Sequence, residues 1–328
     1  MRRFWLKADN GTVWNLAPDN PRDTRNGCFF GNVAGLGLEN DFAQTQVKVD
    51  YFIDNVLSKN VNISGVLYFS SDRHVDSFYN FIQDTQRTFE LHYSPDGRII
   101  ATDQISASWY KPCGIVKLEK RGKNFAGWYE CPVTFKTQSD VWRRDIFISS
   151  SQPEPFGEAL VYPFFYEYEY GGAAVWAVNI TNAGREVEPI IEIINGGETA
   201  VENPYWVNEH ISTDVYDREV KVFQRARFNI ALHAGRTLLV DSRAIANGLS
   251  AQRAVILNNS DGRLMENVYN RQQIDSIKGL DVTGEQEIDF DFINFISLPT
   301  GENRLYFDVG GQQGVNIKIS YQENRELI

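Results

Sequence analysis

Histidine and cysteine side chains, which often act as catalysts or metal ligands, are few in this 328-residue chain. The histidines are His74, His92, His210 and His233, and the cysteines are Cys28, Cys113 and Cys131. No His-Glu-x-x-His sequence or pair of histidines four residues apart has the spacing of a metal site, and the cysteines are too scattered for a zinc site or a disulfide scaffold. No Gly-x-Ser-x-Gly sequence marks a nucleophile. We therefore expect no enzyme, no catalytic residue, no metal and no cofactor, and histidines at the surface or at strand edges.

Two acidic residues, Glu167 and Glu169, have a spacing that could serve catalysis. Residues i and i+2 of a strand lie about 7 Å apart on one face. That separation suits a glycosidase, in which one carboxyl group is the acid and the other the base or nucleophile. The neighbouring sequence supplies no substrate platform beyond nearby aromatic residues. The solvent-facing side of a half-buried strand is therefore the favoured interpretation.

Aromatic side chains offer a second route to sugar binding, because their rings stack on the faces of pyranoses. Trp176, Tyr205 and Trp206 are the candidates, and the Asn203-Pro204 pair before the last two indicates a loop or a strand end. Large aromatic residues are also the dominant material of hydrophobic cores. Core packing is the favoured interpretation for most of the three.

Two glycine-containing segments resemble ligand-binding loops. Residues 31–37 lack the Gly-Lys-Ser/Thr ending of a phosphate-binding loop, so we interpret them as a flexible connection. Residues 258–262, Asn-Asn-Ser-Asp-Gly, resemble a calcium loop, but the register of that loop would put Leu257 at its first ligand position. We interpret this segment as a turn.

Composition and charge narrow the class of protein. Hydrophobic residues make up 42% of the chain, enough for a substantial core, and the length favours two domains. The net charge of −11 is uneven: residues 1–150 hold 18 Lys and Arg against 17 Asp and Glu, whereas residues 151–328 hold 14 against 26. No basic patch for nucleic acid is evident, no apolar run is long enough for a membrane span, and the basic start is not followed by the apolar stretch of a secretory signal. We expect a soluble protein made in a reducing cytosol.

The first half is predicted to be rich in strands, with one helix. Strands are expected at residues 61–69, 89–93, 99–103 and 105–110, and a hairpin is expected to join 115–119 to 128–135. From Asp72 onward, Val75, Phe78, Tyr79 and Ile82 recur at helical spacing, with Ser71 or Asp72 available as the N-cap. Prolines, serines and a glycine at 148–157 then mark a boundary between domains 1–150 and 151–328.

The second half consists almost entirely of predicted strands. They lie at residues 164–170, 189–195, 227–232, 236–241, 303–309 and 315–321, with glycine-containing turns after several of them. Short strands regularly separated by turns are typical of an antiparallel sandwich or jelly roll. The predicted fold class is therefore mainly β, with a β-sandwich-like first domain that carries one short helix and a jelly-roll second domain.

The order of these segments resembles that of the distal tail proteins (Dit) of long-tailed, non-contractile bacteriophages. The resemblance runs through Gly35-Leu-Gly-Leu-Glu-Asn, Gly65-Val-Leu-Tyr-Phe, the helix with Phe78-Tyr-Asn-Phe-Ile, Cys131-Pro-Val-Thr-Phe and Leu298-Pro-Thr-Gly-Glu-Asn-Arg-Leu-Tyr-Phe. It covers nearly the whole chain and is one of order and spacing. It implies that the second domain is a galectin-like jelly roll.

The resemblance implies a structural virion protein. Distal tail proteins form a homohexameric ring at the tail tip, open to the genome, between the major tail protein and a tail-associated hub or fibre. Their outer domains carry receptor-binding proteins in some phages. The chain departs from sugar-binding galectins, because His233-Ala-Gly-Arg236 does not match their His-x-Asn-x-Arg strand and no Trp-x-x-Glu-x-Arg sequence is present. A carbohydrate-binding adhesion module without ring assembly and a glycan-cleaving enzyme remain the alternatives.

Overall fold

The computed structural model describes residues 2–16, 27–37, 40–47, 50–58, 62–84, 88–95, 105, 107–150, 176–213, 219–246, 249–250, 252–269, 295–310 and 314–326. The contacts divide the chain into two compact units, Met1–Arg144 with Asn324–Ile328 (unit 1) and Asp145–Glu323 (unit 2). The predicted strands 99–103 and 164–170 lie outside the described residues. The described elements are antiparallel strands and one α-helix, so the prediction of a mainly β fold with one short helix is confirmed.

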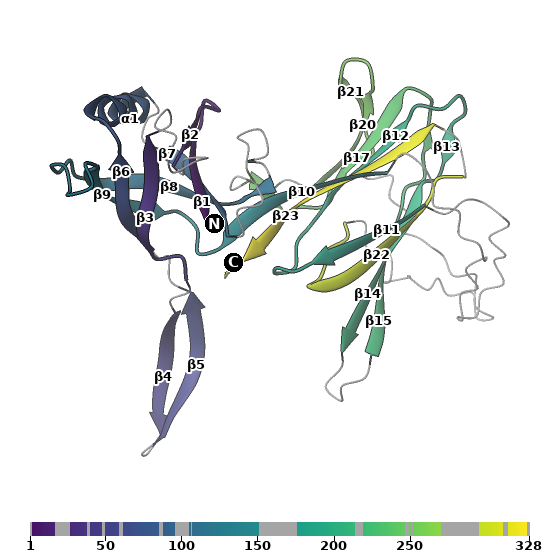
Figure 1. Cartoon of the computed structure of the whole chain (residues 1–328). Coiled ribbons are helices and arrows are strands. Elements are labelled where there is room, and N and C mark those ends of the chain that lie inside the picture. Colours follow the sequence, from purple (N-terminus) through teal and green to yellow (C-terminus); the bar gives the residue numbers. More distant parts are fainter. Residues whose placement is uncertain are drawn as a thin grey trace, which may run out of the picture. The chain divides into compact units, whose positions relative to one another are not determined.

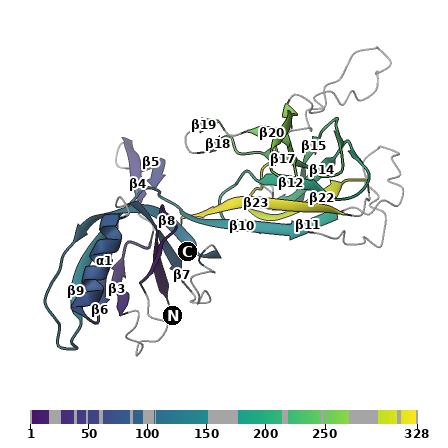
Figure 2. The ribbon, with the colours of Figure 1, turned by 90° about the horizontal axis from the view of Figure 1, so that it is seen from above.

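Unit 1 is built around an antiparallel sheet in the order β2–β1–β7–β8–β9–β6–β3 (Figures 1 and 2). Its strands are β1 (Arg3–Ala8), β2 (Val13–Asn15), β3 (Cys28–Ala34), β6 (Ile63–Phe69), β7 (Thr88–Ser94), β8 (Trp109–Leu118) and β9 (Tyr129–Thr137). The first part of β8 pairs with β7 and the last part with β9, so β8 joins the two halves of the sheet.

Helix α1 (Asp72–Asp84) covers the core of unit 1 (Figure 2). The hydroxyl of Ser71 accepts a hydrogen bond from the backbone N–H of His74, so Ser71 is the N-cap. The predicted apolar face is confirmed, because Val75 and Phe78 are fully buried. Phe78 contacts Phe69 of β6 at 5.4 Å between ring centroids. The helix therefore closes the core by packing aromatic residues on the sheet.

Two local predictions for unit 1 are wrong. Residues 31–34, predicted as a flexible connection, belong to β3, and the pairing with β6 shifts register between Gly31 and Ala34. Ile105 and Ser108, predicted to lie in a strand, belong to no strand of the structure: the backbone N–H and the hydroxyl of Ser108 both donate to the carbonyl of Ile105. Local side-chain hydrogen bonding of this kind competes with a sheet ladder. The predicted hairpin between β8 and β9 is confirmed.

A separate hairpin is formed by β4 (Asn40–Val47) and β5 (Asp50–Ser58) (Figure 1). The two strands pair along their whole length, from Asn40 opposite Ser58 to Val47 opposite Asp50. In the described part of the chain they pair with no other strand. This hairpin therefore belongs to unit 1 without being part of its main sheet.

Unit 2 is a sandwich of two antiparallel sheets (Figure 1). One has the order β11–β22–β14–β15, from β11 (Trp176–Asn182), β22 (Gly301–Asp308), β14 (Tyr205–Thr213) and β15 (Glu219–Arg227). The other has the order β23–β12–β17–β20–β21, from β23 (Val315–Arg325), β12 (Ile190–Asn195), β17 (Arg236–Asp241), β20 (Arg253–Asn258) and β21 (Leu264–Asn267). Strand β10 (Trp142–Ser150) begins in unit 1 and continues into unit 2. Two short strand pairs complete the described elements: β13 (Val201–Glu202) pairs with β16 (Ala231–Leu232), and β18 (Ile245–Ala246) pairs with β19 (Leu249–Ser250).

The core of unit 2 lies between these sheets. It is formed by alternate residues of both, including Ile191 and Ile193 of β12, Leu238 of β17 and Leu305 and Phe307 of β22. Period-two alternation on facing strands is what a β-sandwich requires. The galectin-like character of this domain stays a prediction.

Buried asparagines fix the turns at the ends of the sandwich. The side-chain amide of Asn195 donates to the carbonyls of Thr199 and Leu232, and its oxygen accepts from the N–H of Gly197. In the same way, the side-chain amide of Asn182 donates to the carbonyls of Arg185 and Leu298, and its oxygen accepts from the N–H of Gly184. The turn predicted at 258–262 is confirmed, with Gly262 N–H bonded to the Asn258 carbonyl.

Candidate functional site

The candidate sugar-stacking aromatics are mostly core residues. Trp176 and Trp206 are 1% and 0% exposed, so neither can present its ring to a ligand, whereas Tyr205 is half-buried. The favoured interpretation of core packing is confirmed for both tryptophans. Glu167 and Glu169 lie outside the described residues.

The histidines only partly follow the prediction that they are surface or edge residues. His233 is exposed and His74 is half-buried, with its Nδ1 2.9 Å from the Ser70 hydroxyl. His92 and His210 are buried, so the prediction is wrong for them. Each has a polar partner that compensates for its burial: Nδ1 of His210 is 3.0 Å from the Glu302 carbonyl oxygen.

Glu90 is held as an anion by two neighbours in unit 1. His92 lies with Nδ1 2.8 Å from the Ser108 hydroxyl and Nε2 3.1 Å from Glu90 Oε2, and Lys7 Nζ is 2.8 Å from the same carboxylate oxygen. The hydrogen bond to His92 lowers the pKa of Glu90 most and that to Lys7 lowers it further; these effects outweigh burial, so the pKa falls to about 2. The cluster orients side chains on neighbouring strands β1 and β7.

We expect Glu90 to contribute to the acid stability of unit 1. Its pKa is lower in the folded chain, so its stabilisation is complete above an unfolded pKa near 4.5 and is lost as the pH falls toward 2. The side chain is 34% exposed, so solvent screening reduces the contribution to about 1 kcal/mol. Glu90→Gln should lower the free energy of unfolding at pH 7 by that amount. It should also make this free energy fall less steeply as the pH decreases below 4.5, as measured by urea unfolding from pH 2 to 7.

The control for this prediction is Asp76→Asn, because the Asp76 carboxylate is 68% exposed and lies 3.7 Å from Lys120. It should leave the acid limb of the stability curve close to that of the wild type. An equally steep decline in the wild type and Glu90→Gln would contradict the role of Glu90.

The cysteines are buried and reduced, and burial raises the pKa of each thiol, that of Cys113 to about 12. A thiol with such a pKa stays protonated and is a poor nucleophile at neutral pH. Within the described ranges, no cluster of three or more His, Cys, Asp or Glu residues could hold a metal ion. The described helix lacks the length and apolar character needed to cross a bilayer.

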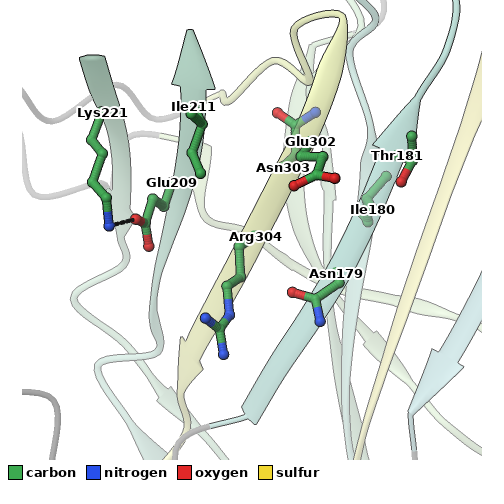
Figure 3. A pocket seen from close by; sticks show the side chains of 9 residues that line it. All are labelled: Asn179, Ile180, Thr181, Glu209, Ile211, Lys221, Glu302, Asn303 and Arg304. Atoms are coloured by element: carbon green, nitrogen blue, oxygen red, sulfur yellow. Dashed lines mark ion pairs between the residues drawn. The ribbon is translucent and has the colours of Figure 1, made fainter. Parts of the chain in front are cut away.

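A polar pocket lies on the outer face of the β11–β22–β14–β15 sheet in unit 2 (Figure 3). Its volume is about 410 Å³, and the residues that line it are Asn179, Ile180, Thr181, Glu209, Ile211, Lys221, Glu302, Asn303 and Arg304. Pairing of the strands sets the polar side chains side by side: Arg304 lies opposite Asn179 on one side and Glu209 on the other. Alternation turns this row away from the core residues on the same strands.

Glu209 of this pocket is held by two neighbouring side chains. Lys221 Nζ lies 2.5 Å from one carboxylate oxygen, and the Tyr306 hydroxyl donates to the other at 2.8 Å. Burial raises the pKa of Glu209, but the hydrogen bonds from Lys221 and Tyr306 together outweigh it, and the pKa is lowered. Arg304 lies over the Tyr306 ring at 5.2 Å. The pocket therefore holds a carboxylate whose position is set by Lys221 and Tyr306.

Sequence reasoning did not identify this pocket. Its polar residues come from four strands, β11, β14, β15 and β22; only β14 and β15 are neighbours in the sequence, and sheet pairing brings the others beside them. The sequence pattern of β14 did not indicate which of its faces is exposed, because both faces carry polar residues: Glu209 alternates with the buried Asn208 and His210. Of its four strands, only β22 was predicted, as residues 303–309, so the sequence offered no set of outer strand positions to compare.

Neither a protein-family model nor a curated protein matches the chain. Among solved structures, it is similar to a chain of the phage P2 baseplate in its activated conformation with calcium, at 11% identity and a TM-score of 0.45 over 100% of both chains. It is also similar to the Dit protein of phage SPP1, a paradigm of the hub adsorption apparatus of phages that infect Gram-positive bacteria, at 12% identity and a TM-score of 0.48 over 98% of both chains. Both TM-scores are below 0.5, so these similarities carry no argument about the function of this chain.

Proposed function

We propose that this chain is a structural protein of a phage tail tip, in which unit 1 assembles as a homohexameric ring and unit 2 projects as an outer module. The ring would join the major tail protein to a tail-associated hub or fibre protein, with an open channel for the genome. The outer module would face the host-adsorption apparatus, including any receptor-binding protein. The sequence resemblance to distal tail proteins supports each of these roles.

The observation that carries the proposal is the β4–β5 hairpin. An isolated two-stranded hairpin is at best marginally stable in water, and its unpaired edges are a template for another chain. Its sequence is rich in apolar residues, among them Phe42, Phe52, Ile53 and Val56. Within the described ranges, no third strand of the same chain pairs with it. A neighbouring copy of the chain would supply the missing partner.

Charge supports self-association through the first half of the chain. Unit 1, residues 1–144 and 324–328, holds 19 basic and 17 acidic residues, so copies of unit 1 can meet without strong mutual repulsion. The acidic second half is suited to a solvated outer position. The same balance argues against sequence-specific nucleic-acid binding, which needs a basic surface.

We infer a non-enzymatic role in the virion, with synthesis in the host cytoplasm and no membrane insertion. The buried thiols are protonated and are poor nucleophiles, and the buried Trp176 and Trp206 cannot stack on a sugar. Both observations support a role in binding and scaffolding; Glu167 and Glu169 lie outside the described residues. No cofactor is required for binding or scaffolding.

Native mass across a concentration series tests the proposal. Light scattering should give about 225 kDa, six times the 37.5 kDa of one chain, and negative-stain images should show rings. A monomer at every concentration would contradict autonomous ring assembly. That result would favour the alternative of an adhesion module that works without a ring.

A further inference from the structure

We propose that the polar pocket on the outer face of the β11–β22–β14–β15 sheet is a binding site for a neutral, hydroxyl-rich saccharide. This assignment is independent of ring formation, because every residue that lines the pocket belongs to unit 2. It also differs from the aromatic platform considered from sequence, because Trp176 and Trp206 are buried in the core.

Hydrogen-bonding groups of both kinds surround the pocket. Glu209 and Glu302 are acceptors, Arg304 and Lys221 are donors, and Asn179 can do both (Figure 3). A carboxylate can accept from two adjacent hydroxyls, and a guanidinium can donate to two adjacent oxygens. Neighbouring hydroxyls of a sugar ring, each both donor and acceptor, match such paired groups.

The balance of charges in the pocket disfavours small ligands that carry a charge. Two carboxylates and two cations line the pocket, so their formal charges cancel. An anion would face Glu209 and Glu302, and a cation would face Lys221 and Arg304. A neutral polyol meets no such repulsion.

The pocket is preorganised and accessible. Glu209 is fixed by Lys221 and by the Tyr306 hydroxyl, so binding need not order it first. Ile211 is 41% exposed and offers an aliphatic surface to the C–H face of a sugar. The volume of about 410 Å³ lies within the range of small-molecule sites, about 300–1,000 Å³. Asn179 and Glu302 are exposed at its rim, so a longer glycan can enter from solvent.

A glycan array probed with the full chain tests the assignment. The array should hold neutral hexose and N-acetylhexosamine oligosaccharides beside sialylated and phosphorylated ones, displayed densely so that weak binding is detected by avidity. The wild type should bind neutral oligosaccharides, and Glu302→Gln and Asn179→Ala should each weaken that binding by about tenfold or more, the loss of about 1.4 kcal/mol. Both residues are exposed, so both variants should fold.

Glu192→Gln is the matched control, because Glu192 lies on β12 of the opposite sheet, paired with Lys318 and Leu239. It should bind like the wild type. Three outcomes would overturn the assignment: no binding to any oligosaccharide, binding to acidic ones only, or binding that both pocket variants retain. None of these outcomes changes the native mass, so a failure here is distinguishable from a failure of ring assembly.

Discussion

Replacing the β4–β5 hairpin, residues 40–58, by a short Gly-Ser linker is expected to convert a ring of about 225 kDa into single subunits. The hairpin pairs only with itself in the described part of the chain, and the described core residues of unit 1 come from other elements. Its removal should therefore abolish assembly without unfolding unit 1. Light scattering gives the mass, and far-UV circular dichroism confirms that the variant stays folded.

A milder variant tests the same hairpin without deleting it. Phe42 and Val56 lie directly opposite each other on β4 and β5, so their double substitution by serine removes two apolar residues at one paired position and keeps the hairpin length. It should shift the concentration of half-assembly upward by tenfold or more. Phe125→Ser is the control, because Phe125 is fully exposed in the connection between β8 and β9. A hairpin-deleted chain that keeps the mass of six subunits would refute the role of the hairpin.

The sequence was most informative where local chemistry and periodicity agreed. Helix α1 combines an N-cap serine with an apolar face at helical spacing, and the β8–β9 hairpin combines two alternating segments with a polar connection. Such elements are specified by their own residues. For this reason their positions were predictable before any tertiary contact was known.

The sequence was least informative about which face of a strand is buried. In β14, one face carries Tyr205, Glu209 and Ile211 and the other carries Trp206 and His210, so neither is plainly apolar. Pairing with β22 and β15 determines which face of β14 is buried, because it places Phe307 and Ala226 beside Trp206. The pocket depends on the same pairing. The burial of the two tryptophans was predictable from residue type, but the pocket was not, because β11 and β22 are distant from β14 in the sequence.

Trp206→Ala is expected to destabilise unit 2 by about 3–5 kcal/mol, the usual cost of deleting a buried aromatic side chain. The Trp206 ring stacks on Phe228 at 5.5 Å and contacts Phe307 at 6.1 Å, and the residue is 0% exposed. Its loss leaves a cavity between the two sheets. That cost is a large fraction of the free energy of unfolding of an ordinary domain, about 5–15 kcal/mol. Unit 2 of the variant should therefore unfold at a much lower denaturant concentration than unit 2 of the wild type.

Two further variants separate the effect of packing from that of surface area. Trp206→Phe keeps an aromatic ring and removes an indole N–H that has no partner among the described residues, so it should cost less than about 1.5 kcal/mol. Val222→Ala truncates a side chain that is 43% exposed on β15 and should cost less than about 0.5 kcal/mol. Urea unfolding followed by far-UV circular dichroism gives the three values. If Trp206→Ala cost no more than Val222→Ala, the tryptophan would not be a core residue, and its ring would return as a candidate ligand platform.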